Sequence, residues 1–394
     1  MHLVLITISG KDAPGITASM MSCIKESRAY IEDMGQSITH GLLSLSILLN
    51  IKDEADGLES KLMKDLLFAA KKLGMEFDFQ EIENLENINL VGEKYILSCV
   101  SQSRISSDFI FDISNALAKN RINILRIDNI SDNTFQTLDI ATISKSENLN
   151  WQKVKEELIQ ISTKHSIDLA LLKDNVWRRN KRLIVMDMDS TLIQSEVIVE
   201  MAKAHGVYDE VHKITEQAMN GELDFDQSLT KRMSLLKGLK QERLKDILTK
   251  IKLTDGVIDF VKTVKSLGYK VAIISGGFSY FANHFKDQLN IDYSFANEIE
   301  VVDGVLTGKV KGSIVNAEKK AMLLELLAQQ ENINLEQVVA IGDGANDLQM
   351  LSKAGLGIAF HAKDIVKKNA NQHMSHGKMD SILYFLGIPG AQEY

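Results

Sequence analysis

Four short apolar runs in the second half of the chain constrain its fold most strongly. They are Leu183–Met186, Val271–Ile274, Val338–Ile341 and Leu356–Phe360, and each has almost no polar interruption. Such runs are typical of parallel strands that are buried on both faces. Segments with a helical pattern, such as residues 256–267, lie between them. The pattern predicts a doubly wound α/β domain, in which ligands bind at the carboxyl ends of the strands.

The chain of 394 residues is long enough for two or three domains. A polar, basic stretch at residues 175–182 precedes the first apolar run directly, as a linker that enters a buried strand would. We therefore expect the α/β domain over residues 180–394. Residues 196–255, which follow its first strand, have a mostly helical pattern. An insertion at this point would cover the carboxyl ends of the strands like a lid.

The first 175 residues have the pattern of one small unit that occurs twice. Strands and helices are expected in the order β-α-β-β-α-β over residues 1–85, and again over residues 90–175. This order is typical of a split βαβ, or α+β, arrangement. The sequence therefore predicts two small domains before the larger one.

Composition excludes several classes of function. The formal net charge of −8 argues against broad binding to nucleic acid or to anionic membranes. Apolar stretches such as residues 41–49 are too short to span a bilayer, and the N-terminus lacks the pattern of a signal peptide. The only cysteines, Cys23 and Cys99, are far apart and have no metal-ligand spacing. We expect a cytoplasmic protein without a disulfide framework.

The first apolar run leads into Asp-Met-Asp-Ser-Thr, residues 187–191. Because side chains alternate along a strand, Asp187 and Asp189 project to the same side. Two carboxylates at the end of a buried strand repel each other, and desolvation raises their pKa values. A hard divalent cation would relieve this repulsion. The local sequence leaves open a simple turn in which Asp and Ser cap the next helix.

Three further segments follow predicted strands or open a helix. Gly-Asp-Gly-Ala-Asn-Asp at residues 342–347 places carboxylates at a strand end, although one aspartate could simply cap the next helix. Ser275-Gly276-Gly277 offers a hydroxyl and free backbone amides to a phosphate, or forms an ordinary turn. Lys319 or Lys320 could neutralise phosphate charge, and helical periodicity does not choose between them.

The order of these segments is more specific than any one of them. Asp-x-Asp-x-Thr, Ser-Gly, Lys and Gly-Asp-Gly-x-Asn-Asp, in that sequence, resemble the haloacid dehalogenase superfamily of phosphohydrolases over the whole of residues 183–394. The insertion at residues 196–255 is similar to the small helical cap of that superfamily.

Within the superfamily, the chain is most similar to the phosphoserine phosphatase family. Glu196 stands seven residues after Asp189, as the family's glutamate does. Residues 225–233 match the family's Phe-x-x-Ser-x-x-x-Arg cap segment, with Phe225 and Arg232 at its ends. Residues 315–321 resemble its lysine segment and favour Lys320.

The resemblance implies a set of catalytic and metal-binding roles. Asp187 would be the nucleophile, and Asp189 would protonate the leaving group and later accept a proton from water. Mg²⁺ would be held by Asp187, the backbone carbonyl of Asp189, and Asp343, with Asp347 close by. The implied reaction is hydrolysis of O-phosphoserine, the last step of serine biosynthesis.

The resemblance also implies how the substrate is held. Glu196 would face the substrate ammonium group, and Arg232 would bind its carboxylate in a two-point contact. The remaining substrate-binding residues implied are Phe225, Ser275, Gly276, Lys320 and Asn346.

The two N-terminal units resemble ACT domains, which are regulatory modules that often bind amino acids between paired subunits. The segment after Lys11 matches the ligand loop of that family; its residues are Asp12, Ala13, Pro14, Gly15 and Ile16. The second copy has residues 102–107 there and lacks the Pro-Gly, which puts ligand binding by that copy in doubt. The resemblance implies a homodimer with serine as a regulatory ligand, although the modules could serve dimerisation alone.

Three other functions remain open from the sequence. The enzyme could act on another small phosphomonoester, such as phosphoethanolamine or a phosphosugar, but such a substrate would not need Arg232. It could transfer the phosphoryl group from phosphoserine to another alcohol. The chain could also be an amino-acid sensor with a decayed catalytic domain, which the intact Asp187, Asp189, Asp343 and Lys320 argue against.

Overall fold

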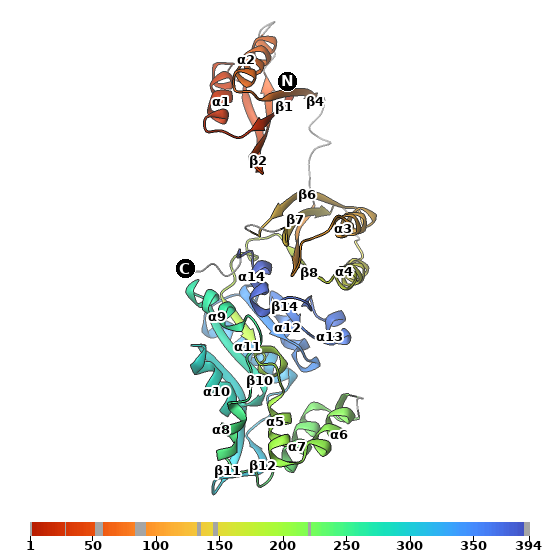
Figure 1. Cartoon of the computed structure of the whole chain (residues 1–394), viewed down its shortest axis with the longest axis vertical. Helices are drawn as coiled ribbons and strands as arrows, with labels where there is room; N and C mark the ends of the chain where they lie inside the picture. The colour runs from red at the N-terminus through yellow and green to blue at the C-terminus, as the bar shows by residue number, and fades with distance from the viewer. Residues whose placement is uncertain are drawn as a thin grey trace. The chain divides into compact units, whose positions relative to one another are not determined.

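The computed structural model describes residues 2–27, 29–51, 58–82, 92–131, 135–144, 149–219 and 222–389. The chain divides into two compact units, residues 1–91 and residues 92–394 (Figure 1).

The first unit is a four-stranded antiparallel sheet covered on one face by two helices. Its elements are β1 (His2–Lys11), α1 (Ile16–Ser27), β2 (Tyr30–Thr39), β3 (Leu42–Ile51), α2 (Leu58–Lys72) and β4 (Glu76–Ile82). The strand order is β2-β3-β1-β4. Alternate residues of β1 and β3 pack with both helices in a closed core, whereas β2 is exposed along its whole length.

The second unit begins with the same arrangement. Its first elements are β5 (Glu93–Ser101), α3 (Ser107–Lys119), β6 (Ile122–Asn129), β7 (Thr137–Ser144), α4 (Trp151–His165) and β8 (Ile167–Lys173), with strand order β6-β7-β5-β8. Here the central strands are buried on both faces: every residue of β7 is buried except Ala141, which is half-buried, whereas the edge strand β6 is largely exposed. One face packs on α3 and α4, while Val100 and Ala170 belong to the core of the domain that follows.

A seven-stranded sheet forms the centre of that larger domain. Its strands are β9 (Leu183–Met186), β10 (Lys270–Phe278), β11 (Tyr293–Val302), β12 (Val305–Lys311), β13 (Val338–Gly342), β14 (Leu356–Phe360) and β15 (Gln372–Met374). The order is β12-β11-β10-β9-β13-β14-β15, and only β12 runs antiparallel to its neighbour. The first strand, β9, is therefore central, between β10 and β13.

Helices bury both faces of this sheet, as the uninterrupted apolar runs require. Ile184 and Met186 pack in one core cluster, and Leu183 and Val185 pack in another on the opposite face. The connecting helices are α9 (Val257–Ser266), α10 (Ser279–Gln288), α11 (Ala317–Gln330), α12 (Leu348–Lys353), α13 (Asp364–Asn369) and α14 (Ile382–Phe385). In α9 the buried residues recur with spacings of three and four, so one stripe of the helix faces the sheet; they are Val257, Phe260, Val261 and Val264.

A helical insertion separates β9 from β10. Its helices are α5 (Val197–His205), α6 (Tyr208–Met219), α7 (Phe225–Leu235) and α8 (Glu242–Leu248). An Asp224–Gln227 capping box begins α7, and buried Leu229 and Met233 anchor that helix in the core. The predicted architecture is confirmed: a doubly wound α/β domain with a helical insertion follows two small α+β domains.

Polar contacts fix the second small domain to the large one. Asp168 on β8 is fully buried, and its carboxylate accepts hydrogen bonds from the backbone N–H groups of residues 375–377. The side-chain amide of Gln372 on β15 both donates to and accepts from the backbone of Leu171. Each of these groups would be unpaired if the two domains separated, and an unpaired buried polar group is costly.

The basic stretch at residues 175–182 is partly buried at this junction. Arg178 is 5% exposed and forms an ion pair of 2.6 Å with Asp139, which also accepts a hydrogen bond from Ser98. Lys181 is 6% exposed and donates to the carbonyl oxygen of Glu336. These charges lie between the two domains, and the division near residue 180 stays a prediction.

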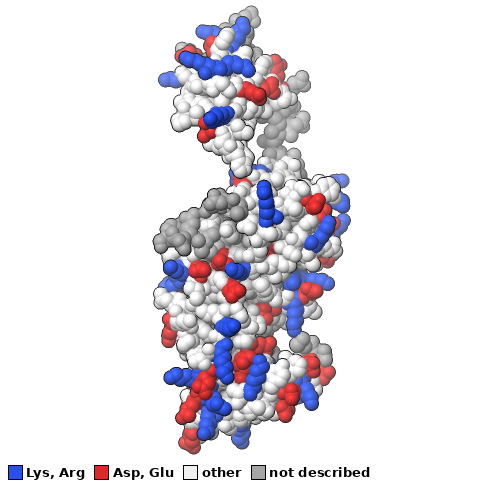
Figure 2. Space-filling view, in the orientation of Figure 1, with Lys and Arg blue, Asp and Glu red and all other residues white. Residues whose placement is uncertain are grey.

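In the described part of the chain, no helix has both the length and the apolar character needed to cross a bilayer. On the face seen in Figure 2, basic and acidic side chains are interspersed.

Candidate active site

The central strand β9 ends at Asp187. The backbone N–H of Asp187 donates to the carbonyl oxygen of Ile341 on β13, which holds the two strand ends side by side. A tight turn, Met188–Leu192, follows, and Ser190 within it has a φ of 55°. The carboxylate of Asp187 accepts a hydrogen bond of 2.7 Å from the N–H of Met188 and is 4% exposed. The turn thus fixes a buried carboxylate at the edge of the sheet.

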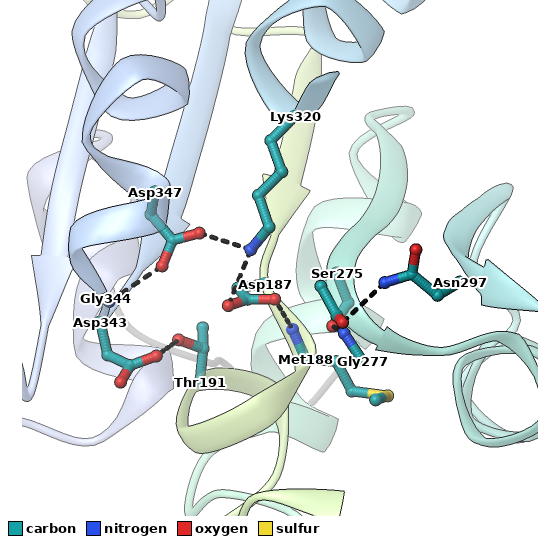
Figure 3. A network of polar contacts seen from close by, with 11 residues as sticks. Asp187, Met188, Thr191, Ser275, Gly277, Asn297, Lys320, Asp343, Gly344 and Asp347 are labelled. Carbon is teal, nitrogen blue, oxygen red and sulfur yellow. Dashed lines mark hydrogen bonds and ion pairs between the residues drawn. The ribbon is translucent and has the colours of Figure 1, made fainter. Parts of the chain in front are cut away.

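Lys320, in the first turn of α11, lies between two carboxylates. Its Nζ atom is 2.9 Å from Oδ2 of Asp187 and 2.6 Å from Oδ1 of Asp347 (Figure 3). Lys320 is fully buried, and the two carboxylates raise the pKa of its ammonium group against the effect of desolvation. Its neighbour Lys319 instead donates to the hydroxyl of Ser313. The structure therefore brings Lys320, and not Lys319, to the aspartates.

Three aspartates form a group that could hold a metal ion. One carboxylate oxygen from each of Asp187, Asp343 and Asp347 lies within 4.8 Å of the other two. Asp343 also accepts a hydrogen bond of 3.0 Å from Thr191, and Asp347 accepts one of 2.9 Å from the N–H of Gly344. Clustered carboxylate oxygens are the donors that hard divalent cations such as Mg²⁺ prefer. The chemistry of this group fits Mg²⁺.

Burial and neighbouring carboxylates raise the pKa values of Asp187 and Asp343. Burial is the main cause at Asp187, where the pKa is about 6 because Lys320 offsets part of the rise. At Asp343 burial and the charges of Asp187 and Asp347 raise the pKa to about 8. Such values are typical of a site that binds a cation, since binding favours the ionised carboxylates.

Asp189 is not part of that group and lies against the last residues of β10. Its carboxylate accepts a hydrogen bond of 2.8 Å from the N–H of Val197 at the start of the cap. A Cβ atom on Gly277 would come within 2.4 Å of this carboxylate, so the close approach requires glycine there. Burial and the nearby Asp187 raise the pKa of Asp189 to about 7. A carboxyl group with this pKa can both donate and accept a proton near neutrality.

The Ser-Gly-Gly turn at the end of β10 faces Asp187 from the other side. Ser275 is fully buried, and its hydroxyl accepts a hydrogen bond of 2.9 Å from the N–H of Gly277. The side chain of Asn297, 3% exposed, donates to the carbonyl oxygen of Gly276 at 2.8 Å. Its own oxygen accepts from the N–H of Val315, just before α11, at 2.9 Å. One amide thus ties the Ser-Gly turn to the segment that leads into the helix of Lys320.

The cap contributes a basic and an aromatic side chain. Arg232 on α7 is 9% exposed, and its Nη1 atom lies 3.9 Å from a carboxylate oxygen of Glu196. Its Nε atom is buried without a hydrogen-bond partner among the described residues. The ring of Phe225 lies over the Ser-Gly turn, because a Cβ atom on Gly276 would come within 2.6 Å of its Cζ atom.

The structure brings most of the predicted residues to one edge of the sheet. Those residues are Asp187, Asp189, Glu196, Phe225, Arg232, Ser275, Gly276, Lys320, Asp343 and Asp347. Asn346 lies on the same loop, and its side-chain oxygen approaches Gly344. The predicted regulatory loop at residues 12–16 lies in the other unit, between β1 and α1.

Sequence reasoning gave no role to Thr191 or Asn297. Thr191 belongs to the Asp-x-Asp-x-Thr motif, so its spacing was a usable signal for its contact with Asp343. Asn297 lies in the middle of β11, and no local pattern marks it; its role depends on two loops that meet only in the fold.

Replacing Asn297 should destabilise the unit that carries the site. Asn297→Ala leaves the Val315 N–H buried without a partner and frees the Gly276 carbonyl, so we expect a loss of about 2 kcal/mol or more in the free energy of unfolding. Urea unfolding measures this loss. Gln288→Ala, at an exposed position on α10, is the matched control and should change the stability by less than about 0.5 kcal/mol. Equal stabilities of the two variants would contradict the bridging role.

Comparisons with known proteins agree with this geometry. Residues 181–355 match the haloacid dehalogenase-like hydrolase family, and residues 2–80 match the ACT domain. A phosphoserine phosphatase from Streptomyces coelicolor is 35% identical over 385 residues, which cover 98% of this chain and 92% of that protein.

Two solved structures extend the likeness. The unliganded probable phosphoserine phosphatase from Vibrio cholerae is 35% identical, with a TM-score of 0.59, over 75% of this chain and 86% of that one. A phospho-aspartyl intermediate analogue of phosphoserine phosphatase is 47% identical, with a TM-score of 0.50, over 52% of this chain and 99% of that one. Because a relative more than 30% identical is covered almost end to end, this chain belongs to the phosphoserine phosphatase family of haloacid dehalogenase-like hydrolases.

Proposed function

We propose that this chain hydrolyses O-phosphoserine to serine and inorganic phosphate, with Mg²⁺ as cofactor and Asp187 as the nucleophile. The observation that supports this most is the buried ion-pair arrangement of Asp187, Lys320 and Asp347 beside Asp343. A carboxylate that could act as a nucleophile lies beside a fixed positive charge and a group of carboxylates that could hold a metal ion. The likeness to a phospho-aspartyl analogue of a phosphoserine phosphatase supports the same chemistry.

The metal would be held by Asp187 and Asp343, with the backbone carbonyl of Asp189 as a third ligand and Asp347 beside them. Bound there, Mg²⁺ would neutralise negative charge between the carboxylates and the phosphoryl oxygens. Asp347 accepts hydrogen bonds from Gly344 and Lys320, which orient it toward the group.

The reaction would proceed in two steps. In the first, a carboxylate oxygen of Asp187 attacks phosphorus while the bond from phosphorus to the serine oxygen breaks, and Asp189 gives its proton to that oxygen. In the second, Asp189 accepts a proton from water, whose oxygen attacks phosphorus and displaces Asp187. Lys320 and the Ser275–Gly277 turn would hold the phosphoryl oxygens in both steps. Asn346 is proposed as a further contact to the substrate.

The substrate would be selected by its two opposite charges. Arg232 is nearly buried and keeps an unpartnered Nε donor, so a carboxylate there would gain a two-point contact. Glu196 is 46% exposed at the side chain and could meet an ammonium group. Phe225, whose ring lies over the Ser-Gly turn, would contact the apolar part of the substrate.

Replacing Asp187 and replacing Asp189 should impair turnover at different steps of the reaction. Asp187→Asn should lower kcat at least about a thousandfold, because the nucleophile is lost. Asp189→Asn should lower kcat by about 10²–10⁴-fold but still form a phosphoenzyme, which intact-protein mass spectrometry detects.

Removal of Mg²⁺ by a chelator should abolish phosphate release, and added Mg²⁺ should restore it.

The control for this experiment is Asp287→Asn, at an exposed carboxylate on α10. Its phosphate release should equal that of the unaltered chain. Near-normal release by Asp187→Asn would rule out this aspartate as the nucleophile.

Arg232 should determine the preference for a carboxylate. Arg232→Ala should lower kcat/KM for phosphoserine at least about 30-fold more than for phosphoethanolamine, which corresponds to about 2 kcal/mol. Arg243→Ala, at an exposed arginine of the cap, is the matched control. Equal losses on the two substrates would mean that Arg232 binds no carboxylate.

We further propose that the first unit pairs two chains and binds serine at residues 12–16. The loop leads directly into α1, and its Gly15 has a φ of 95°, a conformation that glycine favours. Apolar side chains on the sheet of this unit are exposed and could be covered in a homodimer; they are Tyr30, Met34, Ile38, Leu42 and Phe79. A cytoplasmic location is consistent with two free cysteines, Cys23 and Cys99.

Removal of residues 1–91 should separate regulation from catalysis. A chain that begins at Gly92 keeps the second small domain, whose sheet is buried against the large domain. It should retain turnover, sediment as a monomer and lose at least about tenfold in sensitivity to serine, which corresponds to about 1.4 kcal/mol of coupling. Serine is also a product of the proposed reaction and could inhibit at the active site. If serine inhibits the chain that begins at Gly92 as strongly as the full chain, the inhibition occurs at the active site, and regulation by the first unit is contradicted.

A further inference from the structure

A cavity of about 500 Å³ lies between the second small domain and the large domain. On one side it is lined by β5, α4 and β8, and on the other by residues at the start of β14 and along β15. None of the residues assigned to the active site lines it. Asp187 and Asp343 follow the carboxyl ends of the strands, whereas Leu356 of the cavity wall begins β14. A volume of this size is typical of a small-molecule site.

Cationic side chains outnumber acidic ones in its lining. The charged residues are Lys155, Lys173, Arg178, Lys181, Glu93 and Glu336. Lys173 and Glu93 lie 3.5 Å apart and form an exposed pair. Three cations remain, Lys155, Arg178 and Lys181, against the single carboxylate of Glu336 in the lining.

Two of these cations have no acidic partner at close range. Lys155 donates to the carbonyl oxygens of Lys368 and Ala370, and Lys181 donates to that of Glu336. Among the described residues, no carboxylate lies within 4.0 Å of either ammonium group. Carbonyl oxygens fix the two side chains in place, while desolvation lowers the pKa of both ammonium groups; at Lys181 the more distant charge of Glu336 offsets part of this effect. A bound anion would favour the charged form of each lysine.

The third cation is an arginine with a spare donor. Arg178 is 5% exposed, and its Nη2 atom is used by Asp139 at 2.6 Å. Its Nε atom is buried and has no hydrogen-bond partner among the residues described. A buried N–H without an acceptor is uncommon in folded proteins and points to a missing partner.

Aromatic and aliphatic side chains form the rest of the wall. The rings of Tyr95 and Trp151 are in contact, with centroids 4.5 Å apart, and Leu158, Leu171 and Phe385 complete the apolar surface. A bare inorganic ion would leave these side chains against empty space or water. The lining therefore suits a ligand that is both anionic and apolar.

We propose that this cavity binds a small organic anion, with one carboxylate directed to the cationic side chains and an aromatic or branched aliphatic body against Tyr95 and Trp151. The site is separate from the phosphatase site and goes beyond the proposed reaction. The ligand would contact both domains, so its binding would also strengthen their attachment.

Fluorescence of Trp151 can test this proposal directly. The chain contains two tryptophans, so a Trp177→Phe full-length chain reports from Trp151 alone. The probe is 3-phenylpropionate, with its neutral amide, 3-phenylpropanamide, as the charge control. We expect saturable quenching by the carboxylate at concentrations below about 1 mM, and binding of the amide at least about tenfold weaker. Inorganic phosphate, which lacks an apolar body, should bind at least about tenfold more weakly as well.

A double substitution locates the charge. Lys155→Met with Lys181→Met should weaken 3-phenylpropionate binding at least about tenfold, whereas Lys119→Met with Lys153→Met, at exposed lysines of α3 and α4, should leave it within about twofold. If the variant with Lys155→Met and Lys181→Met fails to fold, the chain with both lysines intact still tests the proposal, through the comparison of 3-phenylpropionate with its amide. Equal binding of acid and amide, or no saturable response of Trp151, would overturn the proposal. The readout is binding, so it does not depend on phosphatase activity.

Discussion

The ammonium group of Lys320 makes the rest of the site possible. Asp187, Asp343 and Asp347 have carboxylate oxygens within 4.8 Å of one another in a largely buried position. Two unit charges about 4 Å apart repel by about 4 kcal/mol at an effective dielectric constant of 20. Lys320 contacts two of these carboxylates directly, so with all three ionised the group carries a net charge of −3 + 1 = −2. A divalent cation would balance this remainder, and the raised pKa values of Asp187 and Asp343 describe the group before such an ion binds.

The topology of the sheet brings these charges together. β9 lies between β10 and β13, so the carboxyl ends of these three parallel strands meet at one edge. Asp187 directly follows β9, Ser275 lies near the end of β10, and Asp343 directly follows β13, although more than 150 residues separate Asp187 from Asp343. The bridge through Asn297 then fixes the Ser-Gly turn relative to the helix of Lys320. The geometry of the candidate site thus depends on strand order and on one buried amide.

The two small domains share one topology but have different surroundings. In the first, β2 is fully exposed and the sheet keeps a free face. In the second, Asp168 and Arg178 hold the sheet against the large domain, and its strand β7 is buried on both faces. The second domain is therefore part of the compact unit that carries the active site, and the first is a separate unit. A buried carboxylate that accepts three backbone hydrogen bonds explains why the two parts of that unit stay together.

The sequence by itself determined the fold class and predicted most of the residues that the structure brings together in the candidate site. An uninterrupted apolar run such as Leu183–Met186 has both faces buried only when it lies between two layers of secondary structure. The polar motifs that follow these runs consist of residues close together in the sequence, so they can be recognised there. Local spacing could not determine which of Lys319 and Lys320 turns inward, that Asn297 joins two loops, or that Arg178 and Lys181 are buried in a junction. Those features depend on contacts between residues far apart in the chain, and such contacts exist only once the layers have packed. Tertiary structure alone decided them, because burial and pairing of a polar side chain are properties of its neighbours and not of its own segment.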